Sequence, residues 1–148
     1  MPVTAGSGID IATILDGKEV QRIYQKLQQY PKKIGNKLAS KAGRSAAKVL
    51  AKKVKELVPV DSGDLEDSIK VRAAKGRRDG AKGAMVITGK GFFKGDTYYG
   101  GMIEYGTKRM PNQSFLRHAA ILARDQVVSE WARVMKSLMN SAAKEVSR

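Results

Sequence analysis

The pattern that most constrains this chain lies in residues 31–58, which are bounded by prolines. Apolar residues recur there at steps of three and four, which places them on one face of an α-helix. A second stripe follows the same steps about 100° further round the helix. This stripe carries seven positive charges: Lys33, Lys37, Lys41, Arg44, Lys48, Lys52 and Lys55. We therefore expect a long helix that buries one face and turns a basic flank toward solvent or an anionic partner.

The ends of this helix are marked by its flanking residues. Pro31 suits the first turn, where its missing N–H is not needed, and Pro59 disfavours helical geometry at Val58. Gly35 and Gly43 lie near the apolar face, and each costs about 1 kcal/mol against alanine in a helix. They indicate either the close approach of another element or a hinge.

Composition limits the class of protein. The chain has 148 residues and a net charge of +14, with no cysteine and one histidine. This length fits a single domain, 1–148, with a real core. Disulfides and thiolate zinc sites are excluded, and no apolar run approaches the ~20 residues of a membrane span. The N-terminus does not resemble a signal peptide. The charge predicts an anionic partner: nucleic acid, a membrane surface or an acidic protein.

The N-terminal part is expected to hold one short helix. Residues 1–15 mix small, polar and apolar types and are predicted to be a flexible or extended arm. Asp16 and Glu19 have the spacing of a capping box, with Asp16 as the N-cap and Glu19 reaching back. The helix that follows is expected to end near Gln29.

Residues 68–105 are predicted to form a β-meander with two long loops. Alternating polarity or apolar runs indicate three strands at 69–73, 84–88 and 97–105. The loop at 75–83 is glycine-rich and basic, with Arg77 and Arg78, and the loop at 89–96 carries Phe92, Phe93 and Lys94. Loops longer than a hairpin needs are often functional.

A second long helix is predicted over residues 114–147, with Ser114 as its cap. Its predicted apolar positions include Leu122 and Trp131, and the latter is expected in the core. The expected fold class is α+β: a short antiparallel sheet of about three strands packed against two long helices, plus the short N-terminal helix.

Several residues are of types that can form a chemical site. Acidic residues gather only at Asp61, Asp64, Glu66 and Asp67, whose spacing fits a turn and helix cap better than a calcium loop. His118 has no nucleophile or orienting acid in its sequence context, and no phosphate-binding loop is present. Glu104, in an apolar strand, needs hydrogen bonds or a cation if it faces inward, but it equally fits an outward edge. We expect no enzyme, no metal and no cofactor.

Three blocks of sequence resemble a known family. They are PVDSGDL at 59–65 followed by SI at 68–69, YYGGMIEYGT at 98–107, and SFLR at 114–117. In this order the chain resembles, over roughly residues 15–145, the small tail-component family of lambda-like siphophages, the tail-completion or head–tail joining proteins. The motif positions, to which the resemblance gives a structural role, are Pro59, Asp61, Gly63, Leu65, Glu104, Gly106, Thr107, Phe115 and Leu116.

The resemblance implies a structural role in the virion. Such proteins form a homo-oligomeric ring, here expected to be hexameric, at the neck between the connector or stopper and the tail-tube or terminator proteins. Double-stranded DNA passes through the ring, and no membrane takes part. The loop residues Phe92, Phe93 and Lys94 would contact neighbouring subunits. The basic stripe, with Arg77 and Arg78, would face the DNA channel or an acidic partner. The protein would lie in the virion neck, and in the host cytoplasm during assembly.

Two other interpretations of the charge remain. The basic stripe fits an ordinary solvated helix face, or a histone-like cytoplasmic DNA-binding protein. The latter predicts binding to free duplex DNA with a steep dependence on salt. Only 6% of the residues are aromatic, which weakens any mode that stacks bases on side chains.

Overall fold

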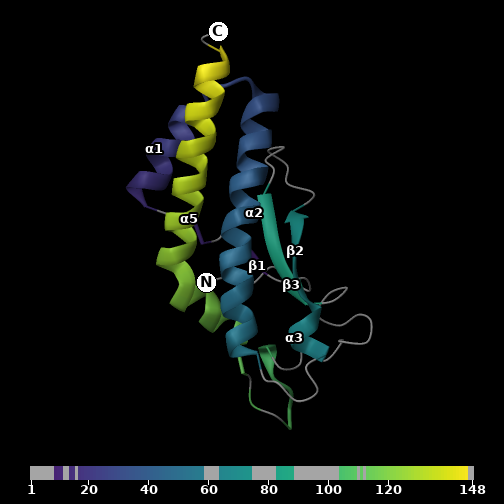
Figure 1. Ribbon diagram of the computed structural model, residues 1–148. Coiled ribbons are helices and arrows are strands. Elements are labelled where there is room, and N and C mark those ends of the chain that lie inside the picture. Colours follow the sequence, from purple (N-terminus) through teal and green to yellow (C-terminus); the bar gives the residue numbers. More distant parts are fainter. Residues whose placement is uncertain are drawn as a thin grey trace.

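The protein is built on two long helices that run side by side in opposite directions (Figure 1). They are α2 (Lys32–Leu57) and α5 (Phe115–Val146). The computed structural model describes the residues in this list: 9–11, 14–15, 17–58, 64–74, 83–88, 104–109, 111 and 113–146. The predicted class is confirmed in part, since the protein is mainly helical with a small antiparallel sheet and an N-terminal helix.

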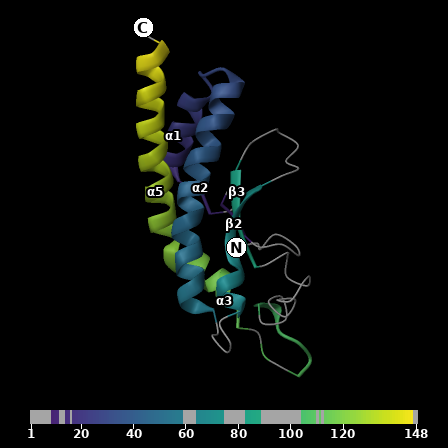
Figure 2. The ribbon, with the colours of Figure 1, turned by 45° about the vertical axis from the view of Figure 1, so that its right-hand side comes forward.

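Helix α2 occupies the middle of the molecule, between α5 and the sheet (Figure 2). Its side chains Leu50 and Val54 are fully buried, and each such apolar side chain contributes about 1.5–3 kcal/mol on burial. Small residues are frequent among the buried positions of both long helices, and small side chains let helix axes approach closely. The fully buried alanines are Ala42, Ala46, Ala47, Ala119, Ala120 and Ala123.

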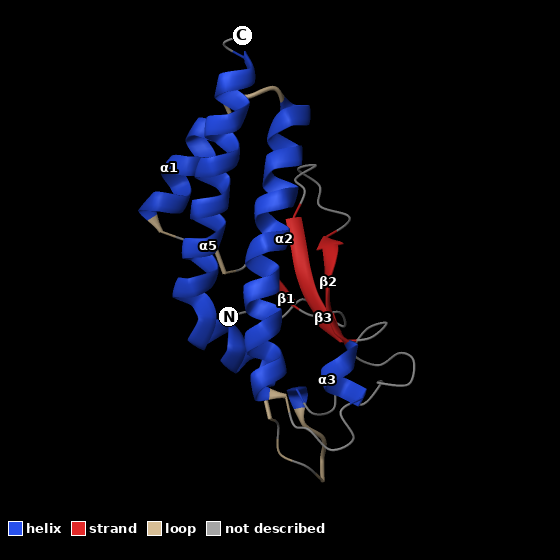
Figure 3. Ribbon diagram, in the orientation of Figure 1, coloured by secondary structure: helices blue, strands red, loops and turns tan. Residues whose placement is uncertain are grey.

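The sheet is small and mostly a hairpin (Figure 3). Strand β2 (Ile69–Ala74) pairs antiparallel with β3 (Gly83–Thr88), with Val71 opposite Val86. On the other edge of β3 lies the two-residue strand β1 (Ile9–Asp10), which gives the order β1-β3-β2. Strand β3 is central and buried, as its apolar run predicts.

The predicted third strand at 97–105 is not confirmed. Residues 97–103 lie outside the described residues, and Glu104 and Tyr105 are helical rather than extended. The N-terminal segment instead supplies the third pairing partner, through β1. In the predicted arm, Ile11 and Ile14 are buried against the core.

Helix α1 (Lys18–Leu27) packs on α5. The predicted capping box is wrong: Gly17 is the N-cap, at φ +101°, and no side chain caps the helix. The Glu19 carboxylate instead accepts a hydrogen bond from Lys136 Nζ on α5 at 2.6 Å. A contact made across 117 positions of sequence takes the place of the local one.

Helix α5 is less uniformly buried than its pattern predicts. Trp131 is 2% exposed, as expected, but Leu122 is 62% exposed and Ile121 is 60% exposed. Ile121 lies 18 positions, about five turns, before Met139 and so shares its face. Figure 1 shows α1 beside the C-terminal part of α5, the part that contains the buried Met139, and not beside the first turns of α5, which contain Ile121. Within the described part of the chain, no helix is both long and apolar enough to cross a membrane.

Helix α2 runs unbroken through Gly35 and Gly43. A substitution at Gly35 tests how closely α1 and α2 approach each other. A Cβ added at Gly35 would lie 3.7 Å from Leu27 Cγ and from the Leu27 carbonyl oxygen, which are ordinary contact distances. We expect Gly35→Ala to raise the free energy of unfolding by about 0.5–1 kcal/mol, since alanine has fewer unfolded conformations to lose. Urea denaturation measures this change. A loss of stability would mean that the added methyl group does not fit, so that α1 and α2 approach more closely than these distances indicate.

Candidate functional site

The predicted basic stripe of α2 lies on the surface. All seven of its side chains are exposed, and we call them the α2 ridge: Lys33, Lys37, Lys41, Arg44, Lys48, Lys52 and Lys55. At 100° per residue the seven fall within an arc of about 100°. The ridge spans about 33 Å at 1.5 Å per residue, which is close to one turn of B-DNA.

The ridge is uncompensated within the described structure. Glu56 is the sole acid in α2, and it pairs with Lys53, outside the ridge, at 3.3 Å. No ion pair recorded among the described residues involves a member of the ridge. Beside the ridge, Ser45 connects α2 to α5. Its Oγ donates a hydrogen bond to Glu130 Oε1 at 2.8 Å. The ridge is therefore a rigid row of positive charge that can bind an extended anionic surface.

Several predicted site residues lie outside the described residues. They are Arg77, Arg78, Phe92, Phe93 and Lys94 in the two loops, and Pro59, Asp61 and Gly63 in the first motif. Their predicted roles at the DNA channel, at subunit interfaces and in the motif stay predictions.

The remainder of the first motif forms a helical turn. Helix α3 (Asp64–Ser68) begins at the acidic cluster, and its residue Leu65 is buried. Ser68 Oγ donates to the Leu65 carbonyl oxygen at 2.6 Å, which closes the turn before β2. Over the residues that the structure describes, no group of three potential metal-ligating side chains is present.

Glu104 faces inward and caps the start of α5. Its side chain is fully buried, and its Oε2 accepts a hydrogen bond from the Leu116 amide at 2.9 Å. Its Oε1 accepts from the Arg117 amide at 3.2 Å and lies 3.8 Å from Arg117 Nε. These are the second and third amides of the helix, the ones an N-cap side chain normally binds. A negative charge at this end is also favoured by the helix dipole.

Ser114 lies at the predicted N-cap position of α5, where its carbonyl oxygen accepts a hydrogen bond from the His118 amide at 2.9 Å. Its Oγ donates a hydrogen bond to the Glu104 carbonyl oxygen at 3.2 Å, so the hydroxyl ties the two segments together. The sequence left open whether the Glu104 side chain faces inward or outward. It did not predict that this side chain would bind the first amides of α5. The signal in the sequence was a charged residue in an apolar block, Glu104, followed ten positions later by the third block.

The other motif residues support the same junction. Gly106 has φ +80°, a conformation that favours glycine. Beside it, the Arg117 guanidinium lies over the Tyr105 ring at 5.5 Å. Thr107 is exposed, and its Oγ1 accepts from the Arg109 amide at 3.3 Å. Phe115 and Leu116 are buried in the core. The second and third motifs therefore form one structural unit. His118, the other residue weighed for chemistry, is exposed on α5.

The pKa of Glu104 is raised from its ordinary value because burial disfavours its charged form. The hydrogen bonds from the Leu116 and Arg117 amides, and the charges of Arg117 and His118, oppose that shift. A raised carboxyl pKa means that the folded protein holds its proton to higher pH than the unfolded chain. The stability that Glu104 contributes is therefore greatest below its unfolded pKa and falls as pH rises through its folded pKa.

This shift predicts a pH dependence that a neutral variant lacks. The free energy of unfolding of the wild type, minus that of Glu104→Gln, should rise as the pH is lowered from 7 toward 4.5. Glu130 provides a control of opposite sign, since hydrogen bonds from Arg133 and Ser45 lower its pKa. The corresponding difference for Glu130→Gln should fall on acidification below that range. Urea denaturation across pH measures both, and a flat Glu104 difference would contradict the prediction.

Comparisons with known proteins agree with the sequence resemblance. The family model described as "Bacteriophage HK97-gp10, putative tail-component" matches residues 21–106. This range covers most of α1, all of α2 and the sheet hairpin, and it ends within the second motif. A search of the curated proteins found no match, and neither did a search of the solved structures. The match covers more than half of the chain, and the chain therefore belongs to the HK97-gp10-like family of bacteriophage tail components.

Proposed function

We propose that this protein is a structural, non-enzymatic component of the neck of a siphophage. Copies of the chain form a ring, expected to be hexameric, that completes the tail and joins it to the DNA-filled head. Membership of a tail-component family implies a location in the virion, and it supports the proposal without distinguishing the neck from other parts of the tail.

The observation that carries the proposal is the α2 ridge. A row of exposed charges of about 33 Å that forms no recorded ion pair among the described residues costs stability through mutual repulsion. Such a row is explained if an anionic surface lies against it in the assembled particle. The proposed surface is double-stranded DNA in the channel or an acidic face of a neighbouring ring. The connector or stopper on one side, and the tail-tube or terminator proteins on the other, are the proposed protein partners.

The test is electron microscopy of lysate from a phage with a nonsense mutation in this reading frame. DNA-filled heads beside separate, normal-length tails are expected for a joining protein. Tails of abnormal length would assign the protein to tail termination instead. Normal infectious particles would contradict any essential role in the tail or neck. Plasmid expression of the wild-type chain should restore plaque formation, which controls for effects on neighbouring genes.

The same ridge is compatible with a histone-like protein that binds free duplex DNA. That function predicts tight binding by the isolated chain, with log K falling by close to one unit per phosphate contact and decade of salt. Filter binding or fluorescence anisotropy with a random duplex measures this slope. Weak or absent binding by the free protein, together with a joining defect in the mutant phage, would exclude the histone-like function.

A further inference from the structure

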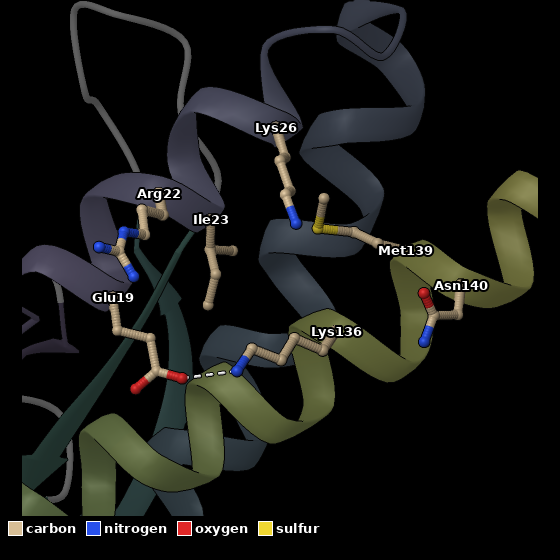
Figure 4. Close-up of a pocket in the computed structure, with 7 residues that line it drawn as sticks. All are labelled: Glu19, Arg22, Ile23, Lys26, Lys136, Met139 and Asn140. Atoms are coloured by element: carbon tan, nitrogen blue, oxygen red, sulfur yellow. Dashed lines mark hydrogen bonds and ion pairs between the residues drawn. The ribbon is translucent and has the colours of Figure 1, made fainter.

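A cleft of about 590 Å³ opens between α1 and α5, and no residue of the α2 ridge lines it (Figure 4). Its floor is apolar: Ile23 is 3% exposed and Met139 is 7% exposed. Its rim is polar and exposed, with Arg22 and Lys26 from α1 facing Lys136 and Asn140 from α5. We call this feature the α1–α5 cleft.

The charges of the cleft are only partly neutralised. Lys136 is paired with Glu19, and this ion pair bridges the two helices at 2.6 Å. Arg22 and Lys26 are one turn apart on α1 and so share a side of the helix. No hydrogen bond or ion pair recorded among the described residues engages either of them. Three cations against one carboxylate leave the lining with an excess of two positive charges.

The walls of the cleft are held in place by neighbouring contacts. The Tyr30 hydroxyl donates to the Met139 carbonyl oxygen at 3.1 Å, and the Tyr24 and Trp131 rings lie 5.2 Å apart. Val20 anchors α1 in the core from the same helix face as Ile23. A site that exists before its ligand arrives loses less entropy on binding.

We propose that the α1–α5 cleft binds an acidic segment of a partner protein that carries an apolar side chain beside its carboxylates. The Arg22 guanidinium can receive a carboxylate in a bidentate manner, and Lys26 adds a second charge. The apolar side chain would cover Ile23 and Met139, and methionine adapts readily to such contacts. Asn140 can hydrogen-bond the backbone of the segment.

A protein ligand fits this cleft better than a nucleic acid does. The described lining has no aromatic side chain on which a base could stack. A phosphate backbone would leave the apolar floor uncovered, whereas arginine and methionine beside a buried apolar patch are typical of protein interfaces. The inference goes beyond the neck function, because it concerns helices and charges separate from the α2 ridge.

The test is a fluorescence-anisotropy titration of the full-length protein with a labelled peptide of alternating Asp and Leu. The double variant Arg22→Gln/Lys26→Gln should weaken binding at least about tenfold, since each charged contact contributes roughly that much. The matched control, Lys70→Gln/Lys108→Gln, removes the same charge from exposed positions outside the cleft and should stay within about twofold of wild type. A peptide with Asn in place of Asp should bind at least about tenfold more weakly.

A second readout locates the peptide. The ε-methyl NMR signal of Met139 should shift on addition of the acidic peptide and stay unchanged in the cleft variant. Circular dichroism confirms that both double variants fold. The proposal would be overturned by equal losses of affinity in the cleft variant and its control, or by equal binding of the Asn and Asp peptides. A Met139 signal that does not shift would also overturn it. So would displacement of the peptide by duplex DNA that itself shifts the Met139 signal. The titration uses the isolated chain, whereas the neck function is tested with a nonsense-mutant phage. A failure of one proposal can therefore be told apart from a failure of the other.

Discussion

Replacing Glu104 by alanine is expected to lower the free energy of unfolding by about 2 kcal/mol, the upper range for loss of an N-cap. The substitution removes the acceptor from the Leu116 and Arg117 amides, which lie at a buried helix start. A buried donor left without a partner costs about 1–3 kcal/mol. Part of this cost is offset, because the substitution also relieves the burial of a carboxyl group whose pKa is raised. Thermal unfolding should show the midpoint lowered by roughly 4–8 °C.

Two comparison variants separate the cap from a general effect of losing a glutamate. Glu56→Ala removes an exposed carboxylate that forms one surface ion pair with Lys53, and it should change stability by less than about 0.5 kcal/mol. Glu104→Gln keeps one acceptor oxygen and should fall between Glu104→Ala and the wild type. If Glu104→Ala were as stable as Glu56→Ala, the amides of Leu116 and Arg117 would have another acceptor.

Periodicity predicted the parts of the fold in which one element meets one broad surface. The apolar and basic stripes of α2 follow a single helical repeat, so both the buried Leu50 and the exposed Lys48 were predictable. Strand β2 alternates Ile69 and Val71 with exposed Lys70 and Arg72, as one wet face requires. Local pattern suffices where burial is uniform along an element.

Contacts between distant segments could not be predicted in this way. Glu19 has the spacing of a capping residue but pairs with Lys136, because α1 docks on α5. Leu122 was predicted at an apolar position but is exposed, on the same face of α5 as the exposed Arg133 and Asn140. The motif indicates a structural role for Glu104. Its partners, the Leu116 and Arg117 amides, could not be predicted, because they lie in the third block and meet Glu104 only in the folded chain.

The same distinction applies to the candidate surfaces. The α2 ridge was visible in the sequence because all its members lie on one helix. The α1–α5 cleft was not, because Arg22 and Lys26 approach Lys136 and Asn140 only through tertiary packing. The family model likewise covers most of α1 but not α5.

Reversing three charges of the α2 ridge is expected to abolish plaque formation while the protein stays folded. The variant Lys41→Glu/Lys48→Glu/Lys52→Glu changes exposed side chains only. It places glutamate within one turn of the remaining cations Lys37, Arg44 and Lys55, so repulsion of about 0.2–0.5 kcal/mol per pair becomes attraction. The thermal midpoint should therefore be equal to or above that of the wild type, and any loss of function belongs to the surface.

A matched variant tests whether position or total charge matters. Lys18→Glu/Lys70→Glu/Lys108→Glu makes the same change of net charge at exposed positions outside the ridge. In complementation of a nonsense-mutant phage, this control should restore plaques, and the ridge variant should leave DNA-filled heads beside free tails. Full infectivity of the ridge variant would remove any role of the ridge in joining.

The salt dependence of binding distinguishes the two anionic surfaces that the ridge could meet. If the ridge contacts DNA phosphates, each lost lysine should reduce the slope of log K against log salt by about one, so the triple variant should reduce it by about three. If the ridge instead meets an acidic ring, duplex binding by the wild type should be weak at physiological salt and the slope unchanged by the variant. Both outcomes require that infectivity be lost, because in either case the row of positive charge on α2 has no other recorded partner among the described residues.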